Sequence, residues 1–69
     1  MTKDEALQVM KLGERVTHRF FTSEEFIYMK DHDIYTEEGY NMGTVFGEFW
    51  QMRQDEFGWK DGWSLYNGK

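Results

Sequence analysis

The sequence predicts an α+β protein in which an N-terminal helix packs on a small antiparallel sheet of about four strands, with short helical turns between the later strands. Two observations carry this prediction. An amphipathic segment with helix-capping residues spans positions 2–13, and apolar residues alternate with polar ones at 15–21 and again at 63–66. A helix followed by a run of strands is typical of the α+β layer arrangement. With 69 residues, the chain is expected to form a single domain, residues 1–69.

Residues 2–13 carry the signals of a complete helix. Thr2 is a capping residue, Glu5 stands three positions later and completes a capping box, and Gly13 is placed to end the helix in the left-handed conformation. On a 3.6-residue wheel, four apolar residues share the side that we expect to face the core: Ala6, Leu7, Val9 and Met10.

The pattern of residues in the middle of the chain predicts strands. Over residues 15–21 two sets of side chains alternate, which predicts a strand with one more polar face: Val16, His18 and Phe20 on one side, and Arg15, Thr17, Arg19 and Phe21 on the other. Residues 26–30 and 34–38 flank the turn-forming stretch "DHD" at 31–33. They are therefore expected to form a hairpin.

The last third of the chain is less regular. Residues 44–53 are compatible with a helix or a strand, and we favour a short helical turn with Thr44 near its start. The stretch "DEFGW", residues 55–59, is typical of a tight turn. A final strand follows and places Trp63 and Leu65 on one face, where we expect both to pack on the N-terminal helix.

Charge is unevenly distributed. The net charge of −5 lies entirely in residues 31–69, where three cations stand against eight carboxylates. Without a broad basic face, general nucleic-acid binding is not expected. The acidic excess favours solubility, or alternatively mimics nucleic acid toward a binding protein. The chain has no cysteine, and its longest apolar run, residues 26–29, is too short to span a bilayer. We expect a soluble, cytoplasmic protein with no membrane partner.

Catalysis is not expected. The only serines and histidines are Ser23, Ser64, His18 and His32, and none has the surroundings of an activated nucleophile. The stretch "DHD" offers three metal ligands, but adjacent residues seldom converge on one ion, so we interpret it as a turn. We predict no catalytic residue, no metal and no cofactor. His18 is expected to be semi-buried, with a hydrogen-bond partner.

Binding chemistry is predicted at the basic strand. Arg15, Thr17 and Arg19 share one strand face, where guanidinium groups can grip a phosphate and the hydroxyl can add a hydrogen bond. The alternative is that both arginines pair with nearby glutamates on a solvated face. Trp50 and Trp59 lie beside glycines in predicted turns, so we expect them at a ligand face or a subunit contact.

Two quoted segments resemble a known family. "DEALQVMKLGERVTHRFF" and "DEFGWKDGWSLY", residues 4–21 and 55–66, are similar to the small phage proteins of the second Thoeris anti-defence family. The resemblance implies cytoplasmic homo-oligomers that sequester cyclic ADP-ribose-type nucleotides at subunit contacts, so that a bacterial immune effector stays inactive. The family's basic strand corresponds to Arg15 to Arg19, its following aromatic to Phe20 or Phe21, and its terminal tryptophan to Trp63.

We therefore expect a phage-type anti-defence protein that sequesters a small signalling nucleotide without catalysis. The predicted ligand-binding residues are Arg15, Thr17, Arg19, Phe21, Trp50 and Trp59. A small acidic inhibitor of a host protein is the alternative, followed by a structural accessory domain of a larger assembly. Binding to a panel of nucleotides and the oligomeric state discriminate between these three.

Overall fold

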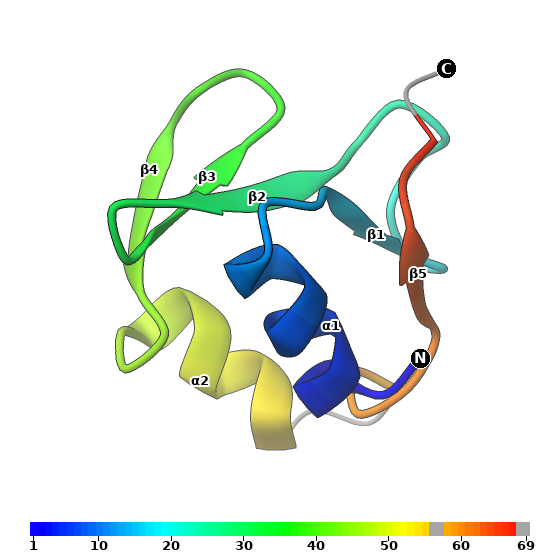
Figure 1. Ribbon diagram of the computed structural model, residues 1–69. Coiled ribbons are helices and arrows are strands. Elements are labelled where there is room, and N and C mark those ends of the chain that lie inside the picture. The colour runs from blue at the N-terminus through cyan, green and yellow to red at the C-terminus, as the bar shows by residue number, and fades with distance from the viewer. Residues whose placement is uncertain (56–57, 68–69) are drawn as a thin grey trace.

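The computed structural model describes residues 1–55 and 58–67, and in this part of the chain the α+β prediction is confirmed. Five antiparallel strands form one sheet in the order β4-β3-β2-β1-β5, and both helices lie on the same side of it (Figure 1). The elements are α1 (Lys3–Lys11), β1 (Val16–His18), β2 (Ile27–Lys30), β3 (Asp33–Thr36), β4 (Asn41–Thr44), α2 (Glu48–Asp55) and β5 (Trp63–Leu65).

Helix α1 begins and ends as predicted. The Thr2 hydroxyl accepts a hydrogen bond from the Glu5 backbone N–H at 3.2 Å, and the Glu5 carboxylate accepts one from the Thr2 N–H at 2.8 Å. These two bonds satisfy amide groups that an isolated helix start leaves unpaired. After the helix, Gly13 has a φ of 95°, the left-handed region that glycine adopts without strain.

The predicted hairpin is also confirmed. Strands β2 and β3 pair from Ile27 opposite Thr36 to Lys30 opposite Asp33. Only Asp31 and His32 form the turn, and both have positive φ, 52° and 72°. Two central residues with positive φ match the right-handed twist of the flanking strands, which explains so short a connection.

Strand β4 was not predicted. The sequence "NMGT" contains Gly43, which has a φ of 92° and lies where the β3–β4 pairing shifts register between Asp33 and Tyr35. This irregular edge strand has no clear alternation, so only its pairing with β3 reveals it.

Helix α2 then follows. The helix that we favoured for residues 44–53 is present, but it starts at Glu48 because Thr44 still belongs to β4.

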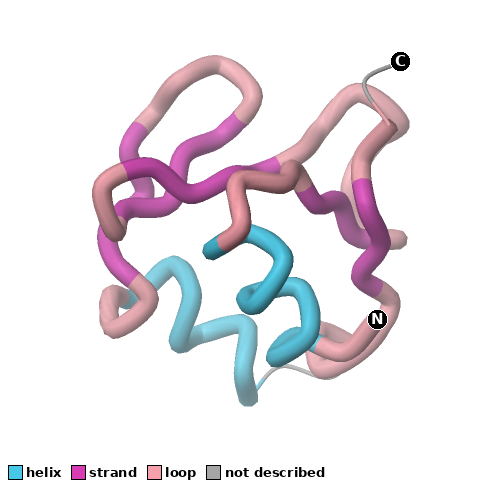
Figure 2. Tube along the Cα trace, in the orientation of Figure 1, coloured by secondary structure: helices cyan, strands magenta, loops and turns pink. Residues whose placement is uncertain are grey.

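The basic strand is shorter than predicted. Strand β1 ends at His18, and the chain turns there because the Phe21 N–H donates to the His18 carbonyl at 2.8 Å. The turn predicted for 55–59 includes residues 56–57, which lie outside the described residues. Figure 2 shows how much of the remaining chain is loop, with the two helices gathered beneath the sheet.

The core lies between the sheet and the helices. Its buried apolar residues are Ala6, Met10, Val16, Ile27, Ile34, Trp50 and Trp63. The prediction for the last strand is half right: Trp63 is 1% exposed, but Leu65 is 48% exposed. Both residues belong to the edge strand β5, and of the two only Trp63 lies in the buried core cluster. Among the described residues, neither helix is long and apolar enough to cross a membrane.

Candidate binding surface on the open face of the sheet

The side of the sheet that faces away from both helices is the candidate binding surface, and we call it the open face. Strand alternation decides which side chains lie on it. Val16, Ile27, Ile34 and Trp63 are buried in one cluster with side chains of both helices, so their neighbours along each strand point the other way. The open face therefore carries Arg15, Thr17, Phe26, Tyr28, Lys30, Asp33, Tyr35, Ser64 and Tyr66.

Four aromatic rings form a row across the open face. Tyr66 and Phe26 have ring centroids 4.5 Å apart, Phe26 and Tyr28 lie 6.2 Å apart, and Tyr28 and Tyr35 stack at 5.6 Å with nearly parallel planes. All four side chains are half-buried, so part of each ring remains accessible to solvent. Such a row offers flat apolar surface for another ring.

Arg15 lies on this aromatic row. Its guanidinium carbon is 5.1 Å from the centroid of Phe26 and 5.5 Å from that of Tyr66, and the side chain is exposed. A guanidinium that stacks on aromatic rings keeps N–H groups at its edge for a carboxylate or a phosphate. Within residues 1–55 and 58–67, no carboxylate forms an ion pair with Arg15. The glutamate pairing considered as an alternative is therefore not found for Arg15 in this part of the chain.

Thr17 shares the open face with Arg15, but its hydroxyl group already donates a hydrogen bond within the protein. The hydroxyl donates to the backbone carbonyl of Glu25 at 2.8 Å and so anchors the β1–β2 loop to strand β1. A hydroxyl that donates within the protein can still accept a hydrogen bond. The predicted role of Thr17 as a donor to phosphate would require this internal bond to break.

Arg19, Phe21 and Trp59 lie apart from Arg15, in an aromatic cluster around His18. Trp59 stacks on the His18 ring at 4.2 Å and is 5.8 Å from Phe21. Arg19 is 5.6 Å from the ring of Phe20. It also passes over Gly62, where an added Cβ would come within 3.0 Å of the Arg19 Nε. Phe21 and Trp59 therefore meet directly and Arg19 reaches Trp59 through Phe20, at the opposite end of β1 from Arg15.

His18 is held by hydrogen bonds on both ring nitrogens. Nδ1 accepts from the Phe20 N–H at 3.1 Å, and Nε2 lies 3.0 Å from the Gly58 carbonyl and 2.7 Å from the Asp61 carbonyl. An amide N–H can only donate and a carbonyl can only accept, so these partners assign the neutral Nε2–H tautomer. The predicted hydrogen-bond partners are present, but the ring is 2% exposed and so lies deeper than the semi-buried position that we expected.

Trp50 is a core residue. It lies in α2 rather than in a turn, is 4% exposed, and has its ring centroid 5.4 Å from that of Trp63. The expectation of incomplete burial is therefore wrong, because the helix turns this side chain toward the sheet. Lys3 lies over the same ring, with its Nζ 4.7 Å from the centroid.

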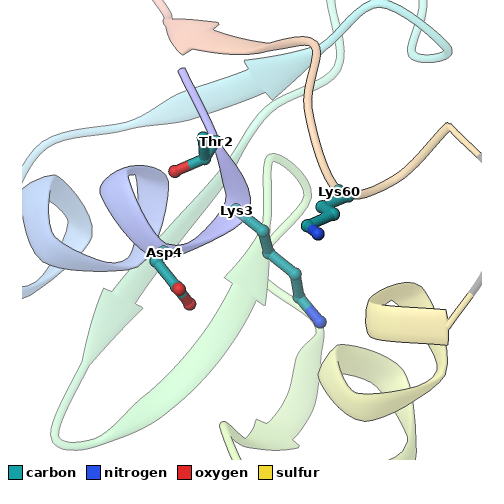
Figure 3. Close-up of a pocket in the computed structure, with 4 residues that line it drawn as sticks. All are labelled: Thr2, Lys3, Asp4 and Lys60. Carbon is teal, nitrogen blue, oxygen red and sulfur yellow. The ribbon is translucent and has the colours of Figure 1, made fainter.

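A separate hollow of about 380 Å³ lies at the start of α1, lined by Thr2, Lys3, Asp4 and Lys60 (Figure 3). Two lysines there suggest an anion site, but the Lys3 side chain extends toward α2 and its Nζ donates to the Trp50 carbonyl. Lys3 is 4% exposed. Its amine therefore supports the packing of α1 against α2.

The open face unites two of the six predicted ligand residues, Arg15 and Thr17. Sequence reasoning missed the aromatic row, although its signal was present: Phe26 and Tyr28 are two positions apart in a predicted strand and must share a face. We compared the chain with protein-family profiles, curated proteins and solved structures, and none matches it.

Proposed function

We propose that this protein binds and sequesters a small nucleotide on the open face, without catalysis. The observation that supports this is the exposed Arg15 guanidinium on the rings of Phe26 and Tyr66. A nucleotide combines a flat base with a phosphate. Stacking of a base on an aromatic side chain contributes about 1–3 kcal/mol, and a guanidinium can hold a phosphate through two parallel hydrogen bonds.

The charges on the open face favour a small anionic ligand. Arg15 and Lys30 are exposed cations there. Asp33 stands directly opposite Lys30 and also accepts a hydrogen bond from the Asn41 side chain at 2.9 Å, so Arg15 is the cation that remains for a ligand. A nucleotide with one or two phosphates needs few cations. DNA or RNA would require an extended basic surface, and the chain carries a net charge of −5.

The proposal includes the biological role that the family resemblance implies. A phage-type anti-defence protein would withhold a cyclic ADP-ribose-type signal from a host immune effector. A single sheet face is shallow, whereas ligand sites usually bury about 70–90% of the ligand surface. We therefore place the bound nucleotide near a contact between copies of the chain, where a second subunit would cover it.

Calorimetric titration of the purified protein with cyclic ADP-ribose, ADP-ribose and cyclic mononucleotides tests the proposal. We expect at least one to bind, and the variant Arg15→Gln to weaken that binding about 10- to 100-fold, as loss of a charge-assisted hydrogen bond does. Lys60→Gln is the matched control, because it removes the same charge from an exposed residue outside the open face.

Three results would contradict the proposal. The first is no binding of any of these nucleotides at millimolar concentration. The second is equal weakening by Arg15→Gln and Lys60→Gln, which would indicate a general effect of net charge. The third is a chain that stays monomeric in light scattering with ligand present, which would exclude a site completed by a second subunit.

A further inference from the structure

A second surface with the properties of a binding site lies away from the open face. It is a hollow of about 330 Å³ where the end of α1, the β2–β3 turn and the loop between β4 and α2 meet. We call it the Phe46 groove, and it is lined by Lys11, Met29, His32, Thr44, Val45 and Phe46. The β2–β3 turn and the β4–α2 loop lie on the left in Figure 1.

Phe46 is the most exposed large apolar residue of the described chain, at 86%. Its loop is nevertheless held in place. The Thr44 hydroxyl accepts from the Phe46 N–H at 3.2 Å, the Thr44 carbonyl accepts from the Gly47 N–H at 3.0 Å, and the Gln51 side chain donates to the Val45 carbonyl at 2.7 Å. An exposed aromatic ring on a fixed loop loses little conformational entropy on binding.

The groove is apolar, and its rim carries one lysine and one histidine. Met29, Val45 and Phe46 supply apolar surface, and Lys11 and His32 are exposed at its edge. Among the described residues no carboxylate lines this hollow, although Asp31 lines the wider hollow that adjoins it on the α1 side. Lys11 supplies a positive charge beside this apolar surface, and the His32 ring can donate a hydrogen bond. The groove therefore complements a ligand that pairs an apolar group with a carboxylate.

We infer that the Phe46 groove binds a short segment of a partner protein in which an aromatic or leucine side chain stands next to a glutamate or aspartate. The apolar anchor would pack against Met29, Val45 and Phe46. The adjoining carboxylate would receive hydrogen bonds from Lys11 and His32. The groove shares no residue with the open face, so this inference does not depend on nucleotide binding.

The test is an NMR titration of the ¹⁵N-labelled protein with two blocked tetrapeptides, Glu-Phe-Leu-Glu and Lys-Phe-Leu-Lys. We expect the acidic peptide to shift the amide signals of His32, Val45 and Phe46 in a saturable way. The basic peptide should bind about fivefold more weakly or not at all, because one ion pair is replaced by repulsion from Lys11.

Two variants at exposed positions distinguish binding from loss of fold. Phe46→Ser should abolish the shifts, while Leu12→Ser removes another apolar side chain, 82% exposed, that does not line the groove and should leave them unchanged. No shifts, equal binding of both peptides, or equal effects of the two variants would overturn the inference. Concentration-dependent shifts of the same signals without peptide would also overturn it, since a second copy would then occupy the groove.

Discussion

At the scale of single residues, the two histidines show how position decides the role of one side-chain type. His18 is 2% exposed and bonds through both ring nitrogens to the backbone of Phe20, Gly58 and Asp61. His32 is exposed, in a two-residue turn with a φ of 72°. The sequence indicates both environments, because His18 alternates with apolar residues and His32 stands between two aspartates.

The same substitution at both histidines should have very different effects. His18→Asn removes the ring stacked on Trp59 and leaves buried backbone groups without partners, so we expect a loss of about 2–4 kcal/mol in the free energy of unfolding. His32→Asn should change it by less than about 0.5 kcal/mol, because asparagine tolerates positive φ. Urea unfolding monitored by circular dichroism measures both. Equal losses would show that the hydrogen bonds of His18 do not stabilise the fold.

At the scale of elements, regular patterns were predictable and irregular ones were not. Helix α1 has a capping box, and the β2–β3 hairpin has a polar turn between apolar strands, so local sequence specifies both. Strand β4 has no comparable local signal, because Gly43 and the shifted register break its alternation. It is a strand because β3 offers its backbone groups for pairing.

The β2–β3 turn should be easy to stabilise. Both of its residues carry side chains at positive φ, a conformation that costs an ordinary residue about 1–2 kcal/mol. Asn-Gly is strongly preferred in such turns. We expect Asp31→Asn combined with His32→Gly to raise the melting temperature by about 4–8 °C, which corresponds to about 1 kcal/mol. Asp31→Asn alone is the control for the lost charge. A double variant that melts no higher than this control would contradict the expectation.

At the scale of the whole molecule, a small core depends on a few large side chains. Trp50 and Trp63 join α2 to the sheet, and Trp50 also contacts Lys3 of α1. A chain of this length is stabilised by only about 0.05–0.15 kcal/mol per residue, so one large side chain represents much of the total. Trp59 is half-buried and stacks on His18 at the border of this core.

Substitution of Trp50 should therefore lower the free energy of unfolding more than substitution of Trp59. We expect Trp50→Ala to lower the free energy of unfolding by about 3–5 kcal/mol, enough to unfold much of the protein at room temperature. Trp59→Ala should cost about 1–3 kcal/mol, because its ring is less buried. Denaturant titration monitored by circular dichroism distinguishes them. A larger loss for Trp59→Ala would place the centre of the core near the His18 cluster.

The sequence by itself determined the α+β class, the capped helix and the hairpin, because the helix and the hairpin depend on residues close together in the chain. The tertiary structure decided which residues share a surface. Alternation along the sequence predicts that Arg15 and Arg19 lie on the same strand face. Because β1 ends at His18, Arg15 instead lies on the aromatic row and Arg19 lies over Gly62. Trp50 became a core residue because α2 packs this side chain toward the sheet, whereas Phe46 lies in the loop before α2 and is 86% exposed.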